Sequence, residues 1–131
     1  MSEPDWEAAR AMSSEARRDE WDGRHREAAD GFYVLADYLE EYDVRDYARE
    51  TRIRARKNHI VAWAQEKHPS WRVELHSVGL YSPGPPALTE DPQAQEAQER
   101  RFVVGRQGRS AKKVVLVEVD AAGRVSIVGW W

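Results

Sequence analysis

The chain of 131 residues contains no cysteine, and this absence excludes three classes of site at once. Without thiols there is no disulfide framework, no thiolate ligand for a metal ion and no cysteine nucleophile. The chain also lacks a continuous apolar run of the roughly 18 residues that a transmembrane helix needs. Its opening residues, MSEPDWEAAR, are acidic and lack the apolar segment of a signal peptide. We therefore expect a cytoplasmic protein without a membrane span.

Recognisable motifs for catalysis or cofactor binding are also missing. The serines at positions 77, 110 and 126 lack the Gly-x-Ser-x-Gly context that exposes a nucleophile on a tight turn. The glycine-rich stretch 105–109 lacks the lysine and the strand-to-helix setting of a phosphate-binding loop. The sequence therefore predicts no catalytic residue and no cofactor, and we expect a binding protein in preference to an enzyme.

Histidine is the remaining candidate metal ligand, and there are four, at positions 25, 59, 68 and 76. No two of them have the i, i+4 spacing that would place two ligands on one face of a helix. Since His25 and His59 fall near the predicted contact between two helices, we interpret them as hydrogen-bonded interface residues. We predict no metal site.

A helical pattern dominates the first half of the chain. Between residues 21 and 42 apolar side chains recur in steps of four and three, which places them on one side of a helix. They are Trp21, His25, Ala28, Phe32, Leu35, Leu39 and Tyr42. Val34 lies on the opposite side, so we expect the helix to be covered there as well. Ser13-Ser14 predicts a break that separates an N-terminal helical arm, residues 1–14, from this helix.

A second helix is predicted from Asp43, as its N-cap, to Lys67, before Pro69. Small residues along one of its faces permit a close approach, so the two helices should form an antiparallel hairpin over about 15–67. A row of arginines should then face the carboxylates of the first helix. The row is Arg45, Arg49, Arg52 and Arg56, and the carboxylates are Asp30, Asp37 and Glu41.

After Pro69 the apolar pattern alternates with a period of two, which is typical of strands. We predict strands over 71–81, 101–106, 112–120 and 124–131, with a proline-rich loop, 82–98, after the first. The third predicted strand is apolar on both sides and should be central in the sheet. The predicted fold class is α+β, with the helical hairpin packed on a four-stranded antiparallel sheet, 70–131, in one domain, 15–131.

The order of the predicted elements over residues 43–131 resembles that of cystatin-type domains. It is also similar to the cone-shaped barrels of ketosteroid isomerase relatives. The resemblance rests on the order of helices and strands, and no motif residue carries it. It therefore implies a fold and assigns no active site.

Charge is distributed unevenly along the chain, although the formal net charge is only −3. Residues 19–46 hold ten acidic residues against three arginines, and residues 99–113 hold six basic residues against Glu99. Arginine and tryptophan are the side chains that most often anchor protein interfaces. We therefore select a basic hairpin and three tryptophans as candidate partner-binding residues: Arg106, Arg109, Lys112, Lys113, Trp130, Trp131 and Trp6.

These features favour a non-catalytic protein–protein interaction domain: an adaptor, an inhibitor or immunity-type protein, or an assembly subunit. A homodimer is possible within this hypothesis. One alternative is a small-molecule pocket or a cofactor-free isomerase or hydrolase, in a cone lined by polar side chains. Those side chains would be Tyr33, Asp37, His59, His76 and Tyr81. Another alternative is nucleic-acid binding through the basic hairpin, 100–113.

Overall fold

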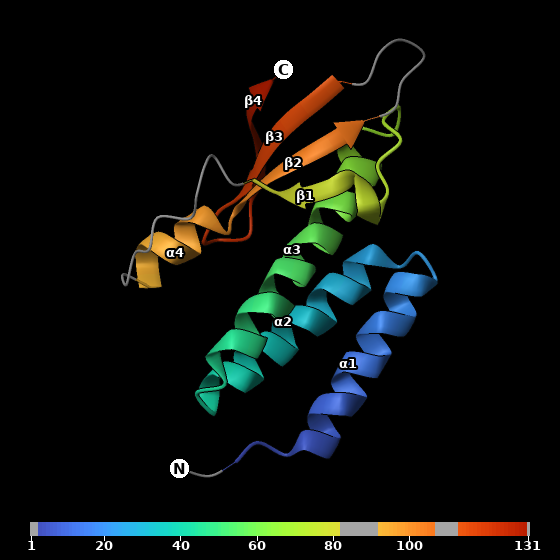
Figure 1. The fold of residues 1–131 in the computed structure, drawn as a ribbon. Coiled ribbons are helices and arrows are strands. Elements are labelled where there is room, and N and C mark those ends of the chain that lie inside the picture. The colour runs from blue at the N-terminus through green and yellow to red at the C-terminus, as the bar shows by residue number, and fades with distance from the viewer. Residues whose placement is uncertain (1–2, 82–91, 107–112, 131) are drawn as a thin grey trace. The chain divides into compact units, whose positions relative to one another are not determined.

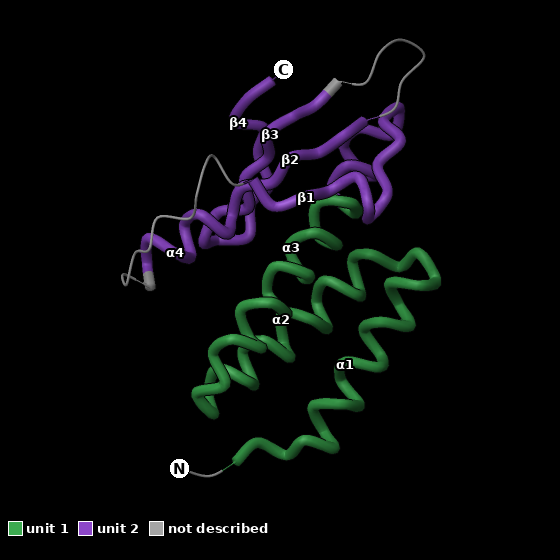
Figure 2. Tube along the Cα trace, viewed as in Figure 1, with its two compact units in different colours: residues 1–62 green, residues 63–131 purple. Residues whose placement is uncertain are grey.

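The computed structural model describes residues 3–81, 92–106 and 113–130 (Figure 1). The chain divides into two compact units, residues 1–62 and 63–131, and the boundary falls within helix α3 (Figure 2). The elements are α1 (Trp6–Trp21), α2 (His25–Glu41), α3 (Arg45–Lys67), η1 (Leu75–Ser77), β1 (Val78–Leu80), α4 (Pro92–Gln98), β2 (Arg101–Arg106), β3 (Lys113–Val119) and β4 (Val125–Trp130). This order and the four-stranded antiparallel sheet confirm the predicted α+β class.

Helix α1 begins at an Asp5 cap, whose carboxylate accepts a hydrogen bond from the Ala8 backbone N–H at 3.1 Å. The predicted break at Ser13-Ser14 is wrong, because α1 continues through it to Trp21. Ala9, Ser13 and Ala16 are buried on one face of the helix. Packing of that face outweighs the weak helix propensity of two serines.

Helices α1 and α2 end in the same way: a residue in the left-handed region follows each helix, and the chain then reverses direction. After α1 this residue is Gly23, with φ 79°, and after α2 it is Asp43, with φ 61°. In the second turn the Val44 N–H donates to the Leu39 carbonyl at 3.0 Å and the Asp43 N–H donates to the Glu40 carbonyl at 3.0 Å. These two bonds form a Schellman motif. The residue predicted to start α3 therefore terminates α2.

The core of the helical unit contains two clusters of small and large apolar side chains. One joins Ala9 to Leu35, Leu39 and Ala48, and the other joins Ala16 to Ala28, Phe32 and Ala55. One hydrogen bond joins the start of α2 to the later part of α3, and another joins the second half of α2 to the first half of α3. The two helices are therefore antiparallel, as predicted from the small residues of α3.

The sheet has the strand order β1-β2-β3-β4 with every neighbouring pair antiparallel, and β3 lies inside it as predicted. The first strand is shorter than the predicted 71–81, because a 3-10 turn occupies Leu75–Ser77. Glu74 and Ser77 form a reciprocal capping box around this turn. The local cap therefore replaces half of a strand that alternation alone had predicted.

A β-bulge changes the facing of the last strand. Ile127 pairs with Val117 and Gly129 pairs with Leu116, so Val128 is an extra residue in β4. Side chains on the two sides of a bulge no longer alternate regularly. As a result Trp130 lies opposite Val115, on the same face of the sheet as the buried Phe102 and Val104.

Candidate functional site

The sheet unit contains a cluster of aromatic rings around one arginine, which we call the aromatic–arginine cluster. Its members are Trp63, His68, Trp71, Arg106 and Trp130. They come from the last turns of α3, the segment after it, and strands β2 and β4. Residues far apart in the sequence thus converge on one face of the sheet.

The rings and the guanidinium are in continuous contact, with one stacked pair and three pairs that meet edge to face. The His68 imidazole lies parallel to the Trp71 indole, with centroids 3.8 Å apart and an interplanar angle of 9°. The Arg106 guanidinium carbon lies 5.0 Å from the centroid of Trp71 and 5.0 Å from that of Trp130. Such cation–π contacts each contribute about 0.5–2 kcal/mol, depending on solvation. These contacts together favour the observed orientations of Trp71 and Trp130.

Arg106 occupies this position without a hydrogen bond from its buried Nε to any residue that the structure describes. Buried polar atoms usually have a partner, so an unpaired Nε marks an arginine held by its rings. The guanidinium places a delocalised positive charge beside the indole of Trp130. The arrangement combines an aromatic surface with a cationic one.

Trp130 is 59% exposed although it belongs to this stack. Its neighbour in β4, Val128, is 43% exposed. A large indole that is both ordered and solvent-accessible loses little conformational freedom when a partner covers it. Chemically this site can bind; no described side chain in it has the pairing of a nucleophile with a base.

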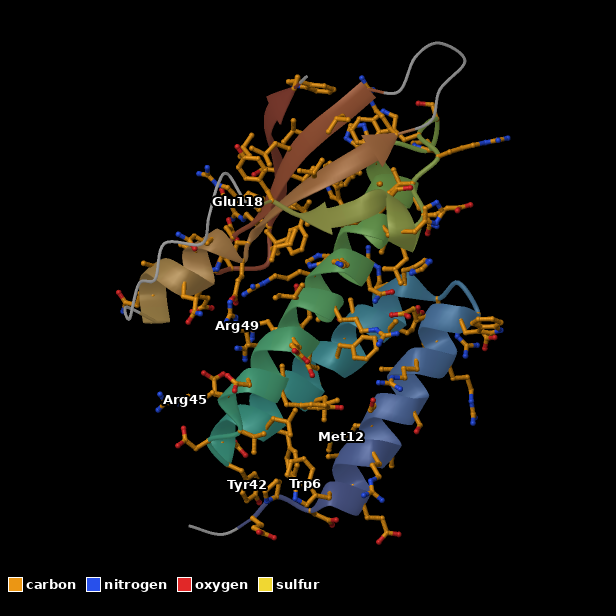
Figure 3. All side chains as sticks on the ribbon, in the orientation of Figure 1. Trp6, Met12, Tyr42, Arg45, Arg49 and Glu118 are labelled. Atoms are coloured by element: carbon orange, nitrogen blue, oxygen red, sulfur yellow. The ribbon has the colours of Figure 1, made fainter. Side chains whose placement is uncertain are left out.

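The structure brings together two of the predicted partner-binding residues, Arg106 and Trp130. Trp6 belongs to the helical unit, where it begins α1 and is 43% exposed (Figure 3). The predicted residues Arg109, Lys112 and Trp131 lie outside the described residues. For Lys113 only the backbone, paired with Arg106, is described.

Two of the predicted pocket residues, Tyr33 and His59, meet inside the helical unit. The Tyr33 hydroxyl lies 3.2 Å from His59 Nδ1, and the two rings meet edge to face. Burial raises the pKa of Tyr33 to about 12. Burial, assisted by the positive charge of Arg26, lowers the pKa of His59. Both shifts favour the neutral pair, in which the phenol O–H can donate a hydrogen bond to the imidazole nitrogen.

The other predicted pocket residues have different surroundings. The Asp37 carboxylate accepts a hydrogen bond from Arg52 at 3.0 Å, as the predicted arginine row implied. His76 and Tyr81 belong to the sheet unit, where His76 lies 3.2 Å from the exposed carboxylate of Glu74. The Tyr81 backbone N–H donates to the Arg101 carbonyl.

A buried polar network was missed by sequence analysis. Asn58 is fully buried and its amide nitrogen donates to Glu20 at 2.8 Å, while its amide oxygen lies 2.8 Å from His25 Nδ1. Arg54 adds two hydrogen bonds to the same carboxylate, at 2.6 and 2.9 Å. Burial alone would raise the pKa of Glu20, but the hydrogen bonds from Arg54 and Asn58 lower it overall.

A sequence signal existed for the buried network but not for the aromatic–arginine cluster. Asn58 lies one helical turn after Arg54 on α3, so both side chains can reach one carboxylate. Trp63, His68 and Trp71 have spacings of five and three, which match no regular element. Only the end of α3 and the fold of the following segment bring their rings together.

The described part of the chain contains no group of three His, Cys, Asp or Glu side chains that could hold a metal ion. None of its helices is long and apolar enough to cross a membrane. No protein-family model matches the sequence, and no curated protein or solved structure gives a significant match.

Proposed function

We propose that the protein is a protein–protein interaction domain and that the aromatic–arginine cluster is its binding surface. The observation that carries this proposal is the exposed indole of Trp130, ordered by contact with Arg106 and Trp71. Tryptophan and arginine are enriched among the residues that dominate the binding energy of protein interfaces. An indole buries much area with only two rotatable bonds. Because Trp130 already contacts Arg106, little conformational freedom of its indole would be lost when a partner binds.

The basic residues that follow Arg106 in the sequence suggest an acidic partner. Arg106 lies at the end of β2, where the chain enters a segment that contains Arg109, Lys112 and Lys113. A cationic surface accelerates association with a negatively charged partner and disfavours a positive one. Trp130 would supply the apolar anchor and the basic residues the orientation.

The test measures binding by the wild-type protein, a Trp130→Ala variant and a Trp21→Ala control. Trp21 is 90% exposed on the helical unit, so its removal also deletes an exposed indole. Partners retained from a lysate of the native host would be identified and their dissociation constants measured with purified proteins. We expect Trp130→Ala to weaken binding by roughly tenfold or more and Trp21→Ala to leave it unchanged. Equal effects of the two substitutions would overturn the assignment of the surface.

Single-stranded nucleic acid is the second candidate ligand, because bases stack on exposed indoles beside arginines. It is disfavoured by the acidic segment 19–46 and the net charge of −3, which repel a polyanion. Titration of a labelled oligonucleotide at low and moderate salt distinguishes a nucleic-acid ligand from a protein partner. Affinity that requires Trp130 and falls steeply with salt would favour the nucleic acid.

A further inference from the structure

Strand β4 lies at one end of the sheet, and its outer edge pairs with no residue that the structure describes (Figure 1). All six residues of Val125–Trp130 are half-buried or exposed, whereas Val115, Val117 and Val119 of the neighbouring β3 are buried. An edge strand presents a row of backbone N–H and C=O groups that can pair with another strand. The sheet is therefore open to extension along β4.

The hydrogen bonds of the sheet show which backbone groups of β4 point outward. The Val119 N–H donates to the Arg100 carbonyl at 2.9 Å, so the backbone groups of Val119 face β2. Successive residues of a strand direct these groups to opposite sides, so those of Glu118 face β4, where Glu118 pairs with Ser126. The residues on either side of Ser126 therefore direct their N–H and C=O groups away from β3, towards the open edge.

These two residues, Val125 and Ile127, share one face of the sheet with the indole of Trp130. Their partners in β3 lie at positions 119, 117 and 115, which alternate with residues of the other face. The bulge at Val128 interrupts the edge, so a regular strand can pair with Val125 and Ile127 and meets Trp130 through its side chain. The edge thus offers a short set of backbone partners beside an exposed indole.

The opposite edge of the sheet lacks these properties. Strand β1 has only three residues, and such short edge strands are one way in which proteins limit unwanted strand pairing. Charged residues and proline serve the same purpose, but the β4 sequence VSIVGW contains neither, and its bulge leaves residues 125–127 regular. Of the two edges, β4 is the one suited to strand addition.

A positive charge lies beside this edge. The guanidinium carbon of Arg106 is 5.0 Å from the centroid of Trp130, and the Arg106 Nε has no hydrogen-bond partner among the described residues. A carboxylate on an added strand can pair with this guanidinium, whereas a basic side chain would be repelled by it. The chemistry specifies an extended segment with apolar residues opposite Val125 and Ile127 and an acidic residue near Arg106.

We propose that the partner of the aromatic–arginine cluster binds as an extended acidic segment that adds an antiparallel strand beside β4. Its backbone pairs with Val125 and Ile127, and its apolar side chains cover the indole of Trp130. Antiparallel addition continues the sheet, in which every neighbouring pair is antiparallel. Main-chain bonds supply the affinity in this mode, and alternate side chains supply the specificity. The inference rests on the proposed function, because it names the form that the partner takes at the same site.

A second copy of the chain is a less suitable occupant of this edge. Stable protein interfaces have about 20–30 residues on each side, and β4 has six. Pairing of β4 with another β4 also brings no carboxylate to Arg106, because the strand is uncharged. An acidic segment from a different protein satisfies both the backbone groups and the guanidinium.

The test uses the capped peptide Glu-Thr-Val-Thr-Val-Thr-Glu and the full chain. In the added strand its valines and glutamates lie on the face of Trp130 and direct their N–H groups towards β4. N-methylation of both valines removes two of these donors, whereas N-methylation of two threonines changes only the far edge. We expect the first form to bind about tenfold or more weakly than the second, measured by fluorescence anisotropy of labelled peptides.

Hydrogen exchange identifies the edge that pairs with the peptide. Exchange of the Val125 and Ile127 amides should slow on binding, whereas that of Ser126, which already faces β3, should not change. Ile127→Pro removes an outward N–H and retains the bonds to β3, so it should weaken binding about tenfold relative to Ile127→Val. Circular dichroism shows whether Ile127→Pro folds, and Val125→Pro takes its place if it does not.

Three results would overturn strand addition: no binding of the unmodified peptide, equal affinity of the two methylated forms, or unchanged exchange at Val125 and Ile127. Equal binding of a peptide with lysines in place of the glutamates would overturn the acidic assignment. Self-association that Ile127→Pro abolishes, detected by sedimentation, would identify a second copy as the occupant. If strand addition failed while Trp130→Ala still weakened binding of host partners, the proposed function would stand without it.

Discussion

The helical unit hydrogen-bonds its buried polar side chains, whereas the sheet unit holds a half-buried arginine against two indoles that meet edge to face. In the first, Asn58 connects Glu20 and His25 through directional bonds. In the second, the Arg106 guanidinium contacts two indoles, and its Nε has no hydrogen-bond partner among the residues that the structure describes. Directional networks are costly to break, because each lost partner leaves another group unsatisfied. A stack depends on contact area and tolerates substitution better.

The largest effect should come from Asn58→Ala in the helical unit. It removes the donor to Glu20 and the partner of His25 and leaves both side chains incompletely hydrogen-bonded. We expect the free energy of unfolding to fall by about 3 kcal/mol, measured by urea denaturation. Arg45→Ala, which removes an exposed pair with Asp43, should change it very little. If the two substitutions lowered the free energy of unfolding by similar amounts, the buried network would not be a special source of stability in the helical unit.

Two glycines provide a matched comparison of backbone strain in the two units. Gly23 has φ 79° and Gly123 has φ 81°, and an added Cβ would meet nothing within 4 Å at either position. Alanine at each should therefore cost only the left-handed backbone strain, about 1–2 kcal/mol of unfolding free energy. Asp43→Gly should have the opposite sign, because Asp43 already adopts this conformation. Thermal unfolding of the three variants measures all of these changes.

The sheet unit should respond weakly to loss of its stacked arginine. Arg106→Ala removes contacts with both indoles, and we expect the free energy of unfolding to fall by about 1 kcal/mol. Arg106→Met retains most of the aliphatic packing and should cost less than the alanine substitution. Denaturation followed by tryptophan fluorescence tests this order. A loss for Arg106→Ala as large as that for Asn58→Ala would contradict the comparison.

The smallest effect is a pH dependence that originates in the Tyr33–His59 pair of the helical unit. The pKa of His59 is lowered in the folded protein, so the unfolded chain binds a proton first as the pH falls below about 6.5. The free energy of unfolding should therefore decrease from pH 7.5 to pH 5.5, and His59→Gln should reduce that decrease.

The same pair should also lower the free energy of unfolding at alkaline pH, this time through Tyr33. The pKa of Tyr33 is raised to about 12, so the unfolded chain loses its phenol proton first above pH 10. Stability should then fall as the pH rises from about 10 towards 12, and Tyr33→Phe should reduce this fall. Denaturation curves at several pH values for wild type and both variants test the two branches. Unchanged slopes in the variants would exclude the pair as their source.

Much of the fold followed from periodicity in the sequence. The steps of four and three from His25 to Leu39 predicted α2, and the alternation in residues 101–106 predicted β2 with the bounds that the structure shows. The turn from Asp120 to Gly123, which joins the two last predicted strands, has Gly123 in the left-handed region. These features depend on neighbours in the sequence, so a local pattern is sufficient to reveal them.

The errors occurred where packing or capping competes with local preference. Two serines predicted a break, but α1 continues because its face at Ala9 and Ala16 is buried. Asp43 predicted a helix start, but its backbone adopts the left-handed conformation that closes α2. In each case the residue type permits two structures, and contacts elsewhere select one of them.

The sequence by itself determined the fold class, the uneven charge and the choice of Arg106 and Trp130 as candidate binding residues. Only the tertiary structure decided that these two side chains share one stack, because an extra residue in β4 reverses the facing of Trp130. Periodicity assigns a side chain to a face of its own element, but surfaces formed by several elements depend on register and interhelical distance, which no local pattern contains.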